Sequence, residues 1–302
     1  MTSPAYAAGF RSLTDEVRLD SLPVEGEVPG WLSGRLLRTG PAKFEVEDES
    51  YNHWFDGLAM LHTFGFDDGQ VSYANKFLES DSYVEAQREG KITIPQFATD
   101  PCRSIFGRVM SMFTADTTDN ANINVARLGE RFVAMTETPI PIEFDPETLE
   151  TLGHLEYPSK VDADVTTAHP HFDFASGHSL NALIKYGRKS THRVVATDPE
   201  TLEREVVGEV RTDRPAYMHS FGMTEHYVVL AAFPFVVNPL DLLKSGEPFI
   251  ENFEWRPERG TRFWVVRRSD GELVAERRTE ACFAFHHVNA FEREDEIVVD
   301  IA

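Results

Sequence analysis

The feature that most constrains the fold is a succession of short segments in which apolar and polar residues alternate, separated by turns rich in Gly, Pro and Asp. Such alternation predicts β-strands. The predicted strands are Arg35–Arg38, Met60–Phe66, Val71–Asn75, Ile123–Arg127, Phe132–Thr136, Asn181–Tyr186, Arg193–Thr197, Tyr227–Ala232, Arg262–Arg267 and Glu296–Ile301. Helical periodicity is confined to Pro101–Phe113 and Pro239–Lys244, so we expect an all-β protein.

Four predicted turns share one format, in which a strand runs into an Asp- or Gly-containing turn and out into another strand. They cover residues 66–71, 144–149, 197–202 and 268–273, and the second and third share Asp-Pro-Glu-Thr-Leu-Glu. A hairpin unit repeated loosely along the chain favours the blades of a β-propeller over a sandwich. The alternative is that these turns recur by chance, since they are common in β proteins.

The charge balance restricts the partners of the chain. Its 302 residues hold 29 Lys plus Arg against 50 Asp plus Glu, a net charge of −21. That length allows one large domain or two ordinary ones, and of these we expect a single domain over residues 1–302. The negative charge argues against a nucleic-acid partner, whose phosphates would be repelled. Lysine occurs at only seven positions, and abundant carboxylates with little Lys resemble the halophile pattern. The alternative is an ordinary acidic protein of the cytosol.

The two cysteines, Cys102 and Cys282, form no Cys-x-x-Cys pair, so we expect neither a zinc site of that type nor a disulfide framework. Lone thiols suit a reducing compartment. The first ten residues lack the charged and apolar regions of a signal peptide, and no window approaches a membrane-spanning length. We therefore expect a cytoplasmic protein.

Three histidines lie in apolar or aromatic surroundings near predicted strands: His169, His219 and His286. Taken singly, each is best explained as a hydrogen-bonded structural residue. Together they suggest a metal site, because convergent imidazoles hold iron, copper or zinc. On a propeller the innermost strand of every blade faces one axis, so single histidines far apart in sequence can meet there.

Several motifs make the chain resemble one known family. They are Gly26-Glu27-Val28-Pro29-Gly30-Trp31, Leu37-Arg38-Thr39-Gly40-Pro41, His53-Trp54-Phe55-Asp56-Gly57, Asp100-Pro101-Cys102, Thr136-Glu137-Thr138, Ala168-His169-Pro170, His219-Ser220-Phe221-Gly222 and Phe285-His286-His287-Val288-Asn289-Ala290. In this order they resemble the carotenoid cleavage oxygenase family, which includes carotenoid and apocarotenoid dioxygenases, stilbene dioxygenases and the retinoid isomerohydrolase. The resemblance runs over almost the whole chain.

The resemblance implies a seven-bladed β-propeller with Fe(2+) held on its axis by four histidines. Three carry over by motif: His169, His219 and His286. We prefer His286 to His287 because neighbouring strand residues point to opposite faces and the family keeps the histidine directly after Phe. The family's fourth ligand lies beyond Ala302, so we expect an incomplete, truncated propeller that lacks its C-terminal blades. His171 is a less favoured stand-in for that ligand.

Glu137 matches a family position whose carboxylate accepts the free N–H of an iron ligand, although a strand carboxylate facing solvent is the alternative. The 22 phenylalanines suit an aromatic tunnel or an ordinary core. The segments Ile105–Phe113 and Phe233–Val237 match an apolar patch that contacts the inner face of the cell membrane, or else are buried. The motif His53–Gly57 is expected to be structural.

The function that the resemblance implies is oxidative cleavage of a C=C bond in a carotenoid or apocarotenoid by dioxygen, giving aldehydes or ketones. Two alternatives stay open. One is stilbenoid cleavage or retinoid isomerisation at the same metal. The other is a truncated, inactive propeller fragment that binds an apolar pigment.

Overall fold

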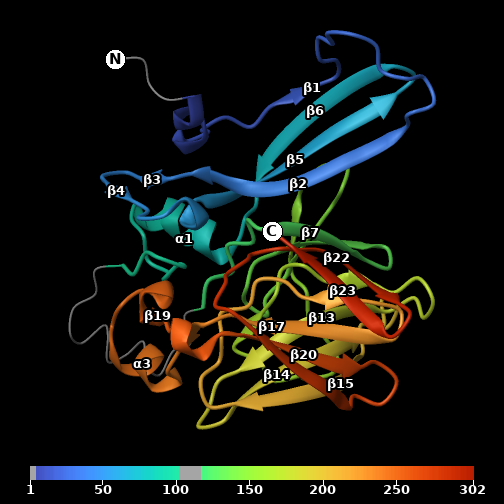
Figure 1. Cartoon of the computed structure of the whole chain (residues 1–302). Coiled ribbons are helices and arrows are strands. Elements are labelled where there is room, and N and C mark those ends of the chain that lie inside the picture. Colours follow the sequence, from blue (N-terminus) through green and yellow to red (C-terminus); the bar gives the residue numbers. More distant parts are fainter. Residues whose placement is uncertain (1–4, 102–116) are drawn as a thin grey trace. The chain divides into compact units, whose positions relative to one another are not determined.

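The computed structural model describes residues 5–101 and 117–302, which are predominantly β (Figure 1). All ten predicted strands are present, most of them longer than the sequence indicated. The predicted helix at Pro239–Lys244 is helix α3, with the same bounds. The helix predicted for Pro101–Phe113 lies almost entirely outside the described residues. No helix of the described part is long and apolar enough to cross a membrane.

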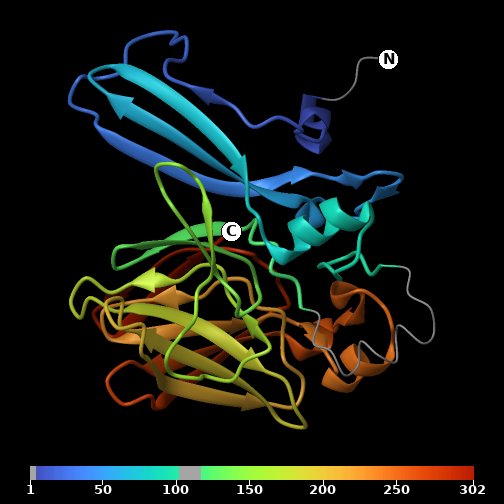
Figure 2. The ribbon, with the colours of Figure 1, turned by 180° about the vertical axis from the view of Figure 1, so that it is seen from behind.

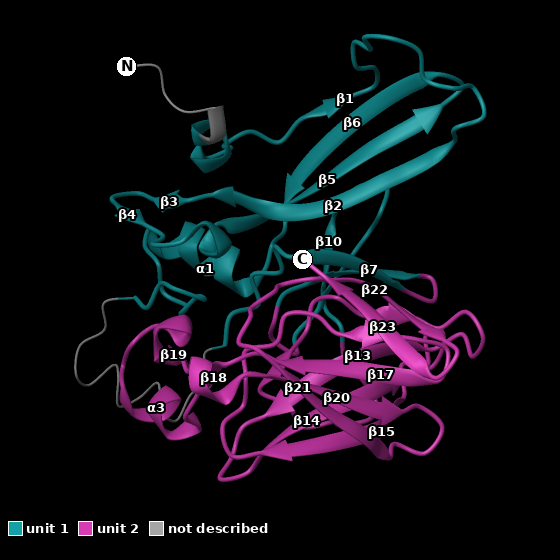
Figure 3. Cartoon of the chain, in the orientation of Figure 1, with its two compact units in different colours: residues 1–127, 131–136, 140–155 teal, residues 128–130, 137–139, 156–302 magenta. Residues whose placement is uncertain are grey.

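The chain divides into two compact units (Figure 3). Unit 1 consists of residues 1–127, 131–136 and 140–155, and unit 2 of residues 128–130, 137–139 and 156–302. The predicted single domain over 1–302 stays a prediction. The predicted site residues His169, His219, His286 and Glu137 all belong to unit 2.

Unit 1 is built on two four-stranded antiparallel sheets, with strand orders β1-β6-β5-β2 and β10-β9-β8-β7. A short β3-β4 hairpin and helix α1 accompany them. Its elements are η1 (Ala5–Phe10), β1 (Arg18–Leu19), β2 (Gly34–Lys43), β3 (Glu45–Val46), β4 (Glu49–Ser50), η2 (Trp54–Asp56), β5 (Leu58–Asp67), β6 (Gln70–Phe77), α1 (Asp81–Glu89), β7 (Asn124–Leu128), β8 (Arg131–Met135), β9 (Ile142–Phe144) and β10 (Thr151–His154).

The motif His53–Gly57 has a structural role within unit 1. It forms the 3-10 turn η2, and the side-chain amides of Asn120 and Asn122 donate to the carbonyl oxygens of this turn, including that of Gly57 at 3.0 and 2.8 Å. Asp56 is fully buried, and its carboxylate accepts from Thr99 Oγ1 at 2.7 Å and from Ala98 N at 3.1 Å. The motif therefore fastens the turn to two other segments, as buried polar groups require.

Unit 2 contains a five-stranded sheet, β11-β13-β14-β15 with β12 beside β13, and a four-stranded sheet, β16-β17-β20-β21. Strands β13, β14 and β15 lie side by side in both views (Figures 1 and 2). Its elements are β11 (Val165–Thr166), β12 (His171–Phe172), β13 (Ser179–Lys185), β14 (Ser190–Thr197), β15 (Arg204–Thr212), β16 (Gly222–Met223), β17 (Tyr227–Ala232), β18 (Phe235–Val237), α3 (Pro239–Lys244), η3 (Phe249–Asn252), β19 (Phe253–Trp255), η4 (Pro257–Arg259), β20 (Thr261–Arg267), β21 (Leu273–Thr279), β22 (His287–Arg293) and β23 (Glu296–Ile301).

The four predicted hairpin turns connect β5 to β6, β9 to β10, β14 to β15 and β20 to β21, all antiparallel pairs. In the two Asp-Pro-Glu-Thr turns the Asp side chain accepts two backbone N–H groups: Asp145 from Glu147 and Thr148, and Asp198 from Glu200 and Thr201. Identical turn chemistry therefore produces the same hairpin twice.

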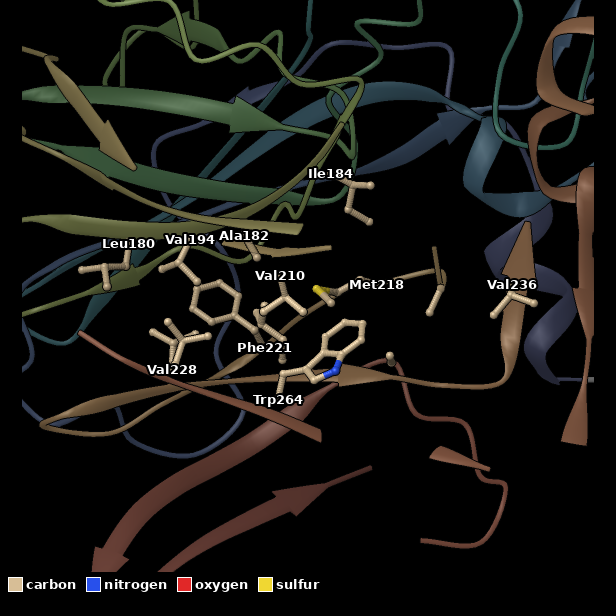
Figure 4. Packing of buried hydrophobic residues seen from close by; sticks show 14 residues of the cluster. Leu180, Ala182, Ile184, Val194, Val210, Met218, Phe221, Val228, Val236 and Trp264 are labelled. Atoms are coloured by element: carbon tan, nitrogen blue, oxygen red, sulfur yellow. The ribbon is translucent and has the colours of Figure 1, made fainter. Parts of the chain in front are cut away.

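The main core of unit 2 joins residues of its two larger sheets (Figure 4). Val194 and Val210 come from the first sheet, and Leu230 and Trp264 from the second; Val194 and Leu230 are fully buried and Trp264 is 2% exposed. Burial of such side chains contributes about 2 kcal/mol each.

The segment Phe233–Val237 belongs to this interior rather than to an apolar surface. Phe233, Val236 and Val237 are 3%, 2% and 0% exposed, so the expectation that their side chains form an exposed membrane patch is wrong. Phe233 packs in a smaller cluster with Ala231 and Ala284. The other half of the predicted patch, Ile105–Phe113, lies outside the described residues.

Candidate metal centre

His169 is held in unit 2 by the strand that runs beside it. It lies in the short link between β11 and β12, and both of these strands pair with β13. Thr167, two residues before His169, is buried, and its N–H donates to Ala182 O of β13 at 2.9 Å. Two points of pairing on one strand therefore fix the position from which the His169 ring projects.

His219 is positioned by core residues on either side of its short segment. Met218 and Phe221 are 3% and 0% exposed and both belong to the main core of unit 2 (Figure 4). His219 is itself 9% exposed. The apolar pattern of Tyr-Met-His-Ser-Phe therefore anchors the chain on both sides of the imidazole.

His286 directly precedes β22, and its backbone N–H and C=O bond to those of Ala302. Its neighbour His287 directs its Nδ1 to Ser220 Oγ, at 2.9 Å. His171 is also directed elsewhere, since its Nε2 donates to Phe221 O at 2.9 Å. Only His286 of these three joins the two histidines described above.

The imidazoles of His169, His219 and His286 converge. One ring nitrogen of each lies within 4.8 Å of the other two, and the Nε2 atoms of His169 and His219 are 2.9 Å apart. The ring centroids are 4.5, 4.9 and 5.1 Å apart. Burial, together with the neighbouring imidazoles, lowers the pKa of His169 to about 4 and also lowers that of His286. These rings are therefore neutral at pH 7, the state that binds a metal.

Glu137 orients the ring of His219. The Nδ1–H of His219 donates to Glu137 Oε1 at 2.7 Å, which leaves the Nε2 lone pair directed at His169. Tyr217 Oη donates to both carboxylate oxygens of Glu137, at 2.9 Å each. Burial, reinforced by the charge of Glu137, raises the pKa of Tyr217 well above its ordinary value, so this hydroxyl stays a donor.

This arrangement fits a bound transition metal. Three imidazoles form a nitrogen donor set of the kind that iron, copper and zinc accept, and a carboxylate hydrogen-bonded to the far ring nitrogen is the usual partner of a ligating histidine. The His169, His219 and His286 side chains would hold the ion. Glu137 would act through His219.

A second group of donor atoms lies in unit 1, at Asp81, Asp119 and His154. The Asp119 carboxylate is already engaged there, because it accepts from the backbone N–H groups of Asp81 and Ser82 at 2.6 and 2.9 Å. It also contacts His154 Nε2 at 2.9 Å. These contacts explain the group as a cap on helix α1.

Residues 10–302 match the model of a protein family that is described as RPE65, retinal pigment epithelial membrane protein. The chain belongs to this family. It is also known as the carotenoid cleavage oxygenase family, so the resemblance inferred from the sequence motifs is confirmed.

Relatives within the carotenoid cleavage oxygenase family cover the chain almost completely. It is 34% identical to the mitochondrial carotenoid-cleaving dioxygenase of Macaca fascicularis, over 99% of this chain and 58% of that protein. It is 36% identical to the human beta,beta-carotene 15,15'-dioxygenase, over 92% of this chain and 56% of that protein. The chain thus spans somewhat less than three-fifths of the length of these relatives.

Solved structures of family members agree with the fold. A variant of the Synechocystis apocarotenoid oxygenase (ACO) matches with a TM-score of 0.85 and 27% identity, over 98% of this chain and 63% of that one. The cobalt-substituted form of the same oxygenase matches with a TM-score of 0.84, 28% identity and the same coverage.

Two contributors to this family site were missed in the sequence, Tyr217 and Ser220. Both lie within two residues of His219, in the segment already singled out. The signal was the position of two hydroxyl side chains in an otherwise apolar run. A buried hydroxyl needs a hydrogen-bond partner, and here the partners belong to the site.

Proposed function

We propose that this chain provides the iron site of an enzyme that cleaves a C=C bond of a carotenoid or apocarotenoid with dioxygen, giving aldehyde or ketone products. The observation that carries the proposal is the convergence of the His169, His219 and His286 imidazoles, with Glu137 behind one of them. Relatives that are named dioxygenases of carotenoids support the reaction class.

In this proposal His169, His219 and His286 bind Fe(2+). The ion, when bound, supplies the redox-active centre that ground-state dioxygen needs in order to react with a polyene. The residues of this chain supply orientation: Glu137 holds the proton on Nδ1 of His219 and thereby keeps Nε2 free for the metal. Tyr217 in turn fixes the carboxylate of Glu137.

The residues beside His219 favour an apolar substrate. The ring of Phe285 lies 5.3 Å from that of His219, and the ring of Phe283 lies 5.0 Å from that of Phe285. Phe233 continues this row, 5.5 Å from Phe283. A row of aromatic rings in edge-to-face and tilted contact beside the proposed metal ligands suits a conjugated hydrocarbon and excludes water.

The proposal extends to the fold and to the location of the protein. We infer that the antiparallel sheets are blades of a seven-bladed propeller, which is how separate sheets deliver single histidines to one axis. We also propose a cytoplasmic protein adapted to high salt that touches the inner face of the cell membrane. Exposed Leu240 and Leu243 of α3, 55% and 67% accessible, support an apolar contact.

The experiment that tests the function uses the full chain, reconstituted anaerobically with Fe(2+), mixed with an apocarotenoid and exposed to ¹⁸O₂. Cleavage products that carry the label are expected. Unlabelled isomers would favour the retinoid-isomerase chemistry instead, and pigment that binds but stays intact would favour the pigment-binding alternative. A His169→Ala variant serves as the matched control for adventitious oxidation.

A further inference from the structure

The buried hydroxyl of Ser220 connects the two chain segments that carry His219 and His286. Ser220 is 6% exposed, and its Oγ donates to Phe285 O at 2.7 Å. The same oxygen accepts the backbone N–H of His287 at 2.9 Å and lies 2.9 Å from His287 Nδ1. One side chain therefore holds the residues immediately before and after His286.

These contacts use the full capacity of the hydroxyl. A serine side chain has one donor and two acceptor positions. Donation to Phe285 O leaves two lone pairs, which accept from the backbone N–H and from the Nδ1–H of His287. This assignment leaves His287 Nε2, which is buried without a partner among the described residues, as a bare acceptor rather than an unpaired donor. That is the less costly of the two tautomers.

The position of the hydroxyl follows from the alternation of a β-strand. The backbone N–H and C=O of His286 bond to Ala302, the residue that directly follows β23. The C=O of Phe285 and the N–H of His287 therefore point to the opposite edge, where Ser220 lies. Ser220 takes the place that the backbone of a neighbouring strand would occupy.

The two segments also approach each other closely at Gly222. A Cβ at this position would lie 3.2 Å from Ala290 Cβ and 3.6 Å from His287 Cδ2. Close approach brings the His219 segment against β22, and the Ser220 hydroxyl then sets how the two segments align. The ring of His287 is held on Ser220, away from the three converging imidazoles.

We propose that Ser220 is a positioning residue that sets the distance between the imidazoles of His219 and His286 and thereby the metal affinity of the site. The inference rests on the proposed function, because it assumes that these imidazoles bind a metal. It assigns no contact between Ser220 and the ion or substrate.

A second contact between the same segments provides the matched control. Glu292, near the other end of β22, accepts from Thr224 Oγ1 at 2.6 Å and from the N–H of His226 at 2.9 Å. Glu292 thus ties the two segments together without touching a residue next to an imidazole of the cluster. Loss of this contact tests whether any weakening of the segment pair affects the site.

The test is a titration of the metal-free full chain with Co(2+), followed by the visible absorption of the bound ion, together with thermal unfolding of the metal-free proteins. We expect Ser220→Ala to weaken Co(2+) binding about 10- to 100-fold and to alter the spectrum, as loss of outer-shell hydrogen bonds does. Glu292→Ala, which removes the acceptor oxygens, should lower the melting temperature with unchanged affinity. The Thr and Val side chains have the same shape, and only Thr carries a hydroxyl. Tighter Co(2+) binding by Ser220→Thr than by Ser220→Val would therefore be due to the hydroxyl.

Wild-type affinity and spectrum in Ser220→Ala would overturn the inference, as would an equal loss of affinity in Glu292→Ala or equal binding by the Thr and Val variants. In each case the wild-type chain still binds Co(2+), so the proposed function survives. If the wild-type chain binds neither Co(2+) nor Fe(2+), the proposed function fails and the inference fails with it.

Discussion

The carboxylate of Glu137 carries two hydrogen bonds that organise the site, one from His219 Nδ1 and one from Tyr217 Oη. Glu137→Ala removes the acceptor of the His219 ring, which then has no fixed tautomer or orientation. We expect metal affinity to fall about 10- to 100-fold, measured by Co(2+) titration. Glu205→Ala, at an exposed position of β15, is the control. Equal affinities in the two variants would contradict this role.

His192 is a second informative residue, buried completely and in tilted ring contact with Trp264, with ring centroids 5.2 Å apart. Burial lowers its pKa to about 4 from the ordinary 6.5. Below pH 6.5 the His192 ring of the unfolded chain binds a proton, whereas in the folded chain the same ring stays neutral until the pH falls to about 4. Stability that is fully present above pH 6.5 is therefore lost as the pH falls toward 4, by about 3 kcal/mol from this residue.

The measurement for His192 is the free energy of unfolding between pH 7 and pH 4 in the wild type and in His192→Phe, which keeps an aromatic ring against Trp264. The Phe variant should lose about 3 kcal/mol less over this range. Other buried histidines contribute equally to both proteins and cancel. Superimposable pH profiles would contradict the interpretation.

Residue identities in the site were predictable only where a motif carried them. The sequence indicated His169, His219, His286 and Glu137, and the structure brings these four together. The choice of His286 over His287 agrees with the placement of the rings. The hydroxyl of Ser220 was visible in the sequence, but its partner was not, because the contact with Phe285 O spans 65 residues of chain.

Hairpin turns are the elements on which the fold depends most visibly, and Gly271 of the β20–β21 turn is the sharpest case. Its φ is 72°, and a Cβ there would lie 2.0 Å from Val207 O of β15. Gly271→Ala should therefore cost about 2 kcal/mol or more, since both the left-handed backbone and the close approach oppose a side chain.

The control for Gly271 is Gly187→Ala in the turn before β14, where the nearest atom to an added Cβ is Lys189 O at 3.6 Å. This change should leave stability nearly unaffected. Chemical denaturation of both variants measures the difference. Equal stabilities of Gly271→Ala and the wild type would show that the turn does not have this geometry.

Strands with a continuous apolar run can be found in the sequence, whereas exposed strands with polar residues on both faces cannot. Strand β17 is apolar throughout and was found, whereas β22 and β21 are mostly exposed and carry polar residues on both faces, so they have no alternation to detect. Helix α1 was missed because only Ser82 and Ala86 are buried along it. The cap residues Ser80 and Gly90 were its remaining signal.

At the scale of the whole molecule, the net charge of −21 predicts a dependence on salt. Raising KCl from about 0.1 M to about 1 M shortens the Debye length from about 10 Å to about 3 Å and screens the repulsion among carboxylates. The melting temperature should therefore rise by several degrees. Sucrose at equal water activity is the control, and an equal rise in sucrose would contradict salt adaptation.

Metal binding by this protein is tested by its iron content. The full chain is reconstituted anaerobically with Fe(2+), desalted and analysed for bound iron. We expect about one equivalent of iron per chain in the wild type and a large loss of bound iron in His169→Ala, His219→Ala and His286→Ala. Less than about a tenth of an equivalent in the wild type, or the same content in all four proteins, would contradict it.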